Sequence, residues 1–165
     1  MPPQVKEHEA GLIAPEVAVL DVAAGGGRHS RFFAERGHRV TALDRDTSRL
    51  TGHPGIDIVQ ADLEDGSPWP LPGRTFGAVV VTSYLHRPLF PALLDALAPG
   101  GVLLYETFME GNERFGEPSR PAFLLKDGEL LDLARGRLSV TAYEARMISE
   151  PKMAMAQRIA ARRPG

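Results

Sequence analysis

Residues 19–30 read Val-Leu-Asp-Val-Ala-Ala-Gly-Gly-Gly-Arg-His-Ser. Together with Val17 and Ala18, the first residues form an apolar, β-branched run, which is typical of a strand buried on both faces of a sheet. The three glycines predict a tight turn, and residues 28–36 read as a helix that ends at Gly37. The stretch therefore predicts a buried strand that passes through a glycine turn into a helix.

The rest of the chain continues this alternation. Apolar runs predict four further strands, at residues 39–43, 56–60, 76–82 and 102–107. Helical patterns occupy residues 87–98 and 128–135, with Asp127 as the expected cap of the second, and Thr47 or Ser48 is expected to cap a short helix. The Pro- and Gly-rich residues 64–74 exclude a helix, and the loop around Trp69 is expected to cover the sheet there. Residues 138–145 and 153–161 alternate as a closing strand pair.

Strand–helix units first and two consecutive strands last predict an α/β fold. We expect a Rossmann-like, doubly wound, mostly parallel sheet of seven strands, with the last pair forming an antiparallel edge. The length of 165 residues fits a single domain, residues 1–165, made of an N-terminal segment (1–16) and a core (17–161).

Composition excludes several classes of function. The 19 Lys and Arg against 21 Asp and Glu leave a formal charge of −2, which disfavours a nucleic-acid partner. The chain has no cysteine, so disulfide frameworks, zinc–thiolate sites and thiol catalysis are excluded, and we predict no metal site. No apolar run approaches 18 residues, so we expect no membrane partner and a cytoplasmic protein. The oligomeric state stays open.

Polar or glycine signals follow four successive strands. They are residues 21–27, Asp44, Asp62 and the pair Thr82 and Ser83. In an open α/β sheet, ligands bind beyond the carboxyl ends of the strands, at the point where the strand order reverses. Four signals along one edge therefore predict a single ligand site.

The glycine turn suits a phosphate or a carboxylate, because backbone N–H groups line the start of a helix and glycine lets a ligand approach closely. The charge of Asp21 disfavours a pyrophosphate there and suits a ligand that carries an ammonium group. A tight turn without a ligand is the alternative.

Asp44 and Asp62 are the expected nucleoside contacts. Asp44 ends the second strand, where a carboxylate commonly accepts both ribose hydroxyls, although it could also be a turn residue. The nearby Asp46 is the weaker competitor for that role. Asp62 could accept the exocyclic amine of adenine while the Leu63 N–H bonds a ring nitrogen, and an Asx turn is an equally good interpretation.

These residues resemble the class I S-adenosylmethionine-dependent methyltransferases, and among them the compact bacterial proteins described as tellurite-resistance-like methyltransferases. The resemblance spans residues 17–161. The segments that carry it are Val-Leu-Asp-Val-Ala-Ala-Gly-Gly-Gly-Arg-His-Ser (19–30), Val-Thr-Ala-Leu-Asp-Arg-Asp (40–46), Ala-Asp-Leu-Glu (61–64), Tyr-Leu-His-Arg-Pro-Leu (84–89) and residues 105–116.

The resemblance implies S-adenosylmethionine as the cofactor and a role for each position. The methionine moiety would lie against Ala23, Ala24, Gly25 and Gly27, with Asp21 near its ammonium. Asp44 would bind the ribose, Arg45 would pack beside the adenine, and Asp62 and Leu63 would bind the adenine edge. Thr82 and Ser83 would lie beneath the sulfur. Ala23 stands where this family commonly has glycine, which a negative φ at that residue would tolerate.

Methyl transfer from a sulfonium mainly requires a positioned nucleophile and the exclusion of water, so a general base is optional. The weak candidates for a base are His86, Tyr84 and Glu106, although His86 fits a helix cap or a carbonyl contact better. Residues 82–85, Thr-Ser-Tyr-Leu, lack the Asn/Asp-Pro-Pro-aromatic signature of enzymes that methylate base or amide nitrogens. A small-molecule acceptor is therefore expected, with residues 1–16 and 108–123 left to build its pocket.

Two other classes of function stay open. One is a non-catalytic module that binds the cofactor or a partner protein, because no residue is securely catalytic. The other is a nicotinamide-dinucleotide oxidoreductase. Its fingerprint needs a third glycine where this chain has Ser30, which disfavours it.

Overall fold

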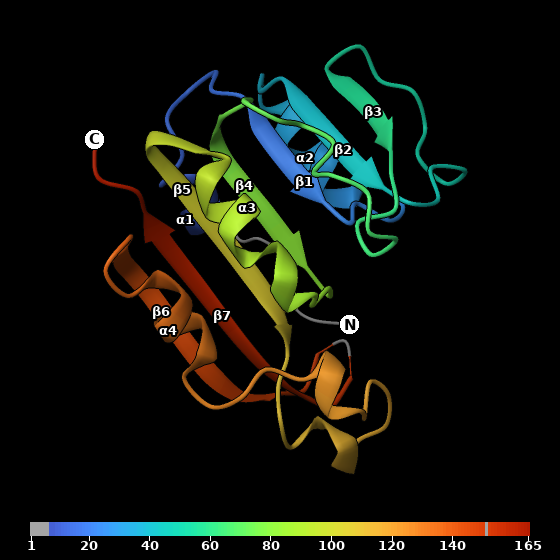
Figure 1. The fold of residues 1–165 in the computed structure, drawn as a ribbon, viewed down its shortest axis with the longest axis vertical. Coiled ribbons are helices and arrows are strands. Elements are labelled where there is room, and N and C mark those ends of the chain that lie inside the picture. Colours follow the sequence, from blue (N-terminus) through green and yellow to red (C-terminus); the bar gives the residue numbers. More distant parts are fainter. Residues whose placement is uncertain (1–6, 151) are drawn as a thin grey trace.

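A computed structural model describes residues 7–150 and 152–165. Its centre is one seven-stranded sheet with the order β3-β2-β1-β4-β5-β7-β6 (Figure 1). The strands are β1 (Val19–Val22), β2 (Val40–Asp44), β3 (Ile56–Gln60), β4 (Phe76–Thr82), β5 (Leu97–Phe108), β6 (Ser139–Ile148) and β7 (Ala154–Arg162). This sheet confirms the predicted α/β class.

The sheet has the pairing expected of a doubly wound fold with an edge hairpin. Strands β1 to β5 are parallel to one another, while β7 pairs antiparallel with both β5 and β6. The chain moves outward from β1 to β2 and β3 and then returns to the other side of β1 with β4. The strand order therefore reverses between β1 and β4, which is where such folds bind ligands.

Helices cover both faces of the sheet. On one face, Phe33 and Ala34 of α2 (Arg28–Glu35) pack with Ala10 of α1 (Glu7–Ala10) against buried strand residues. On the other face lie the short helix η1 (Arg87–Leu89), α3 (Phe90–Asp95) and α4 (Glu129–Ala134), in front of β4 to β7 in Figure 1. Two further short helices, η2 (Asn112–Arg114) and η3 (Pro121–Phe123), lie in the segment after β5.

The predicted helix at residues 87–98 is shorter and divided. Pro88 and Pro91 each stand in the first turn of a separate helix, η1 and α3, where proline removes no intrahelical hydrogen bond. The helix ends at Asp95 because Leu97 already pairs with Phe76 of β4, and a bulge follows before the regular ladder resumes.

Two smaller expectations are wrong. Residues 45–55 contain no helix, and Leu50 instead donates its N–H to the Thr47 carbonyl in a turn at 3.1 Å. Asp127 does not cap helix α4, because Gly128, in the left-handed conformation (φ +73°), occupies the position before the helix. The Glu129 carboxylate accepts the Lys126 N–H at 2.8 Å.

The loop that joins β3 to β4 replaces a helix. Leu71 is buried in the same cluster as α3 and α4 residues, and Trp69 packs half-buried against it, so the loop covers the sheet as expected. Trp69 thus fills space as a hydrophobic plug. Within the described part of the chain, no helix is long and apolar enough to cross a membrane.

Candidate active site

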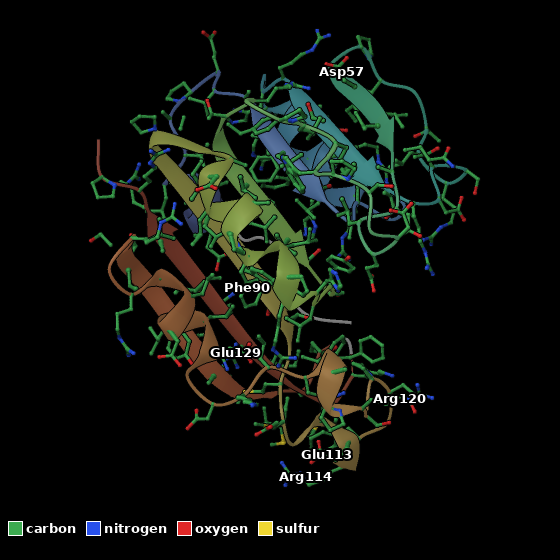
Figure 2. All side chains as sticks on the ribbon, in the orientation of Figure 1. Asp57, Phe90, Glu113, Arg114, Arg120 and Glu129 are labelled. Carbon is green, nitrogen blue, oxygen red and sulfur yellow. The ribbon has the colours of Figure 1, made fainter. Side chains whose placement is uncertain are left out.

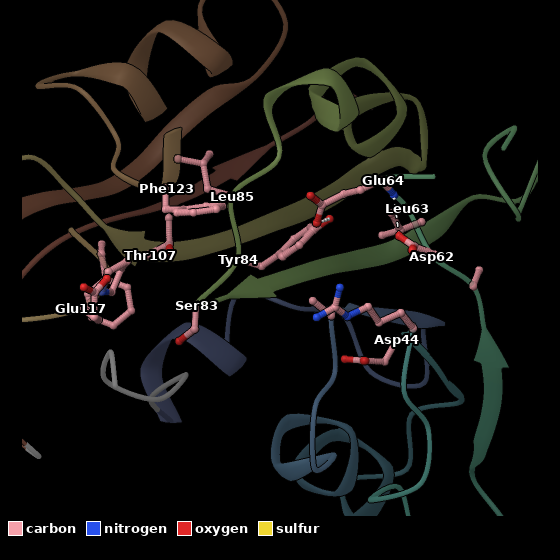
Figure 3. A pocket seen from close by; sticks show the side chains of 15 residues that line it. Asp44, Asp62, Leu63, Glu64, Ser83, Tyr84, Leu85, Thr107, Glu117 and Phe123 are labelled. Atoms are coloured by element: carbon pink, nitrogen blue, oxygen red, sulfur yellow. Dashed lines mark hydrogen bonds between the residues drawn. The ribbon is translucent and has the colours of Figure 1, made fainter. Parts of the chain in front are cut away.

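A cavity of about 700 Å³ opens at the carboxyl ends of the parallel strands (Figure 3). Small-molecule sites typically occupy about 300–1,000 Å³, so the space suits a nucleoside-sized ligand and a second small molecule. The walls come from the segments that follow β1 to β5. The lining residues are Ala23, Asp44, Arg45, Ala61, Asp62, Leu63, Glu64, Ser83, Tyr84, Leu85, Thr107, Phe108, Glu117, Pro118 and Phe123.

Six of the eleven residues predicted to bind the cofactor line this cavity: Ala23, Asp44, Arg45, Asp62, Leu63 and Ser83. The other five, Asp21, Ala24, Gly25, Gly27 and Thr82, lie outside its lining. Of the three candidate bases, only Tyr84 lines it.

The glycine turn is tightly wound. The Ala24 N–H donates to the Leu43 carbonyl of β2, and the Gly27 N–H donates to the Ala24 carbonyl. Ala23 has φ +56°, the left-handed region, which corrects the expectation of a negative φ at this alanine. The chain turns too sharply after β1 for Ala23 to stay extended. The turn therefore imposes a strained left-handed conformation on Ala23.

Asp44 ties the glycine turn to the end of β2. Its Oδ2 accepts the Gly25 N–H at 2.8 Å, and its Oδ1 accepts the Asp46 N–H at 2.9 Å. A carboxylate offers about four acceptor positions, so two remain available to a ligand. The turn interpretation of Asp44 and the ligand interpretation are therefore compatible.

The same holds for Asp62. Its Oδ1 accepts the Glu64 N–H at 2.9 Å, which is the Asx turn considered for this residue. Asp62 and Leu63 nonetheless lie on the cavity wall, with Asp44 on the same side of the space (Figure 3).

Tyr84 and Glu64 meet across the cavity. The Tyr84 hydroxyl donates to Glu64 Oε2 at 3.0 Å, joining the loop after β4 to the loop after β3 (Figure 3). Burial raises the pKa of Tyr84, and Glu64 raises it further. The phenol is thus held protonated as a donor. His86 lies outside, in a separate depression beside Trp69, with its Nδ1 3.7 Å from Glu64 Oε1.

A buried polar cluster supports the switch point from behind. Asp21 is 1% exposed and accepts the Ser30 hydroxyl at 2.7 Å, and burial raises the pKa of its carboxyl to about 6. His29 lies 3.3 Å (Nδ1) from the Thr82 hydroxyl, and burial lowers its pKa to about 4. Sequence reasoning assigned no role to His29, although its place in the first turn of the helix could have indicated one.

Glu106 faces away from the cavity. It is buried and lines a small depression that it shares with Thr82, Arg158 of β7 and Glu9 of α1. Arg158 and Glu9 form an ion pair at 3.0 Å. The described part of the N-terminal segment thus packs under the sheet rather than over the cavity.

The segment after β5 supplies the far wall, as the sequence suggested for residues 108–123. Asn112, 1% exposed, donates to the Pro118 carbonyl and accepts the Met155 N–H. The fully buried Gln157 bonds the Lys126 carbonyl and the Leu130 N–H. These amides fix the segment against β7, and the cavity wall is therefore built in advance rather than formed by a free loop.

Comparison with known proteins gives the class that this fold and site define. The model of the methyltransferase domain family matches residues 19–101, half of the chain, from the start of β1 to the early part of β5. A solved S-adenosylmethionine-dependent methyltransferase from Methanosarcina mazei has the same fold, with a TM-score of 0.73 and 13% identity over 96% of this chain and 98% of that one. The chain belongs to the methyltransferase domain family, and S-adenosylmethionine is the cofactor of this class.

Curated relatives match in part. A malonyl-[acyl-carrier protein] O-methyltransferase from Serratia marcescens is 31% identical over 85% of this chain and 58% of its own length. A trans-aconitate 2-methyltransferase from Paracidovorax citrulli is 35% identical over 52% of this chain and 36% of its own. The chain therefore spans less than two thirds of the length of either relative. The narrower resemblance to the tellurite-resistance-like proteins stays a prediction.

Proposed function

We propose that this chain transfers a methyl group from S-adenosylmethionine to a small-molecule acceptor bound in the cavity, with residues 17–161 as the cofactor-binding core. The observation that carries the proposal is the placement of Ala23, Asp44 and Asp62, from the ends of three different strands, on one continuous cavity at the switch point. The family match supports the reaction class.

The residues present fit the cofactor. Asp44 keeps two acceptor positions for a diol, and Asp62 and Leu63 stand together on the wall where an adenine edge would be bound. A side chain at Gly27 would meet Leu50 at 2.8 Å, so only glycine keeps the turn this compact. Four other predicted residues do not line the cavity and would contribute indirectly, by holding the shape of the turn behind it: Asp21, Ala24, Gly25 and Thr82.

S-adenosylmethionine supplies a methyl group already activated on a sulfonium. The chain then has to hold the acceptor in line and keep water out. Ser83 and Ala23 border the switch point, while Leu85, Phe108 and Phe123 give an apolar wall that disfavours water. The fixed far wall makes this arrangement available before an acceptor binds.

The proposed mechanism needs no general base. Tyr84 is held as a donor to Glu64, His86 lies in another depression, and Glu106 lies in a third. The role of the chain is therefore positioning, with proton release to solvent after transfer.

Incubating the protein with S-adenosylmethionine labelled in its methyl group and a panel of small molecules tests the proposal. We expect label in at least one acceptor together with formation of S-adenosylhomocysteine. Tight cofactor binding with no transfer to any acceptor, including proteins and RNA, would instead support a non-catalytic binding module.

A further inference from the structure

The cavity has two chemically different ends. Asp44, Arg45 and Asp62 line one end, where the proposed function places the ribose and the adenine. The other end is formed by Leu85, Thr107, Glu117 and Phe123 (Figure 3), and the lining also includes Phe108 and Pro118, which follow Thr107 and Glu117 in the chain. It is apolar apart from one hydroxyl and one carboxylate, so it suits a hydrophobic or aromatic frame.

The formal charge of the lining is negative. Four carboxylates, Asp44, Asp62, Glu64 and Glu117, face one guanidinium, Arg45, which leaves −3. Among the residues that the structure describes, the one charged residue lining the acceptor end is Glu117, whose carboxylate accepts the Ser119 N–H and hydroxyl at 3.1 and 3.0 Å. Both of these bonds are solvent-exposed and leave acceptor positions free.

Two arginines near this end, Arg87 and Arg114, are already engaged. Arg87 makes bonds of 2.6 and 2.9 Å to Glu129 and donates to the carbonyls of Ala122 and Leu124. Arg114 donates to the Gly111 carbonyl and lies at the outer tip of the segment (Figure 2). Within the described residues, no arginine or lysine lines the acceptor end, and these are the side chains that bind a carboxylate most strongly.

Resting on the proposed function, we infer that the acceptor is a nitrogen nucleophile that is uncharged at neutral pH, an aromatic amine or an aromatic ring nitrogen, on an apolar frame. The nitrogen lone pair forms the new N–CH₃ bond, and the electron pair of the broken S–CH₃ bond leaves with sulfur. The positive charge passes from sulfur to nitrogen, and an amine product then releases its proton to water. The products are the methylated acceptor and S-adenosylhomocysteine.

The sign of the lining explains the choice of nitrogen. A neutral nucleophile carries the positive charge through the transition state into the acceptor end, where Glu117 stabilises it. A carboxylate acceptor would be repelled by the negative lining of the cavity. Its methylation would also neutralise the positive charge of the sulfonium, which the negative lining stabilises. The names of the two relatives described above do not decide the matter, because this chain matches less than two thirds of the length of either.

Calorimetric titration of two probes of equal shape and opposite charge tests the inference. The probes are 1-methylquinolinium, which resembles an N-methylated product, and 1-naphthoate. Each is titrated into protein saturated with S-adenosylhomocysteine, whose own binding is measured first. We expect the cation to bind at least about tenfold more tightly than the anion, with the difference shrinking as salt is added.

Glu117→Gln should reduce this ratio by about threefold or more. Glu113→Gln is the matched control, because Glu113 lies on the same segment (Figure 2), accepts the Gly111 N–H and does not line the cavity. It should leave the ratio unchanged.

Equal or tighter binding of 1-naphthoate would overturn the inference while leaving the proposed function in place. Binding of neither probe would contradict the apolar acceptor wall and overturn it too. Absence of S-adenosylhomocysteine binding would overturn both proposals.

Discussion

Replacing Asp44 by alanine removes the carboxylate that joins the glycine turn to β2. In the structure this carboxylate already accepts two backbone N–H groups, from Gly25 and Asp46, and it has two acceptor positions left for the ribose hydroxyls. Two charge-assisted hydrogen bonds to a half-exposed group contribute roughly 1.5–3 kcal/mol in total. We therefore expect the Kd for S-adenosylhomocysteine to rise by about 10- to 150-fold.

The variant should also lose a little stability, because the two N–H groups lose a protein partner but can be hydrated. The expected loss is about 0.5–1.5 kcal/mol, measured by urea denaturation. Asp46→Ala is the matched control for the binding experiment. It removes the same charge two residues away, where the carboxylate accepts the Ser48 N–H and does not line the cavity. Unchanged affinity in Asp44→Ala, or an equal loss in both variants, would refute the ribose assignment.

Three further predictions concern the turn, the buried cluster and the far wall. Ala23→Gly should raise the free energy of unfolding by about 0.5–1 kcal/mol in urea denaturation, because φ +56° strains alanine but not glycine; a loss of stability would contradict this. Burial raises the pKa of Asp21 to about 6 from 3.8 in the unfolded chain, so its contribution to stability grows as pH falls from 6 to 3.8. Burial lowers the pKa of His29 to about 4 from 6.5, so its contribution is lost as pH falls from 6.5 to 4. Urea denaturation between pH 6.5 and 3.8 should show Asp21→Asn losing stability relative to the unsubstituted protein as pH falls, and His29→Gln gaining stability relative to it. Parallel pH profiles for the three proteins would contradict the argument. Asn112→Ala should cost about 1–3 kcal/mol, because two part-buried backbone groups lose their hydrogen-bond partner, and it should weaken 1-methylquinolinium binding more than S-adenosylhomocysteine binding in calorimetry.

Local patterns predicted the parallel core well. The strands at residues 56–60 and 76–82 begin and end where expected, because their apolar runs are bounded by polar or turn residues. Long-range pairing decided the rest. Leu97 joins β5 only because Phe76 lies beside it, and a helical pattern over residues 87–98 contains no sign of that partner.

The cofactor end of the cavity was predictable because its residues follow strands directly. The acceptor wall was predictable only as a segment, residues 108–123. Glu117, Pro118 and Phe123 reach the cavity because Asn112 fastens that segment to Met155 of β7, 43 residues away in the sequence, and Gln157 of β7 holds Lys126 just beyond it. The conformation of Ala23 was missed because its left-handed φ is imposed by the turn and not by the preference of alanine.

The central claim is that this sheet edge binds the methyl donor rather than a dinucleotide. Calorimetric titration of the protein with S-adenosylmethionine, S-adenosylhomocysteine and NADH tests it most directly. We predict that both sulfur compounds bind one per chain and that NADH does not bind. Binding of NADH alone would contradict the account.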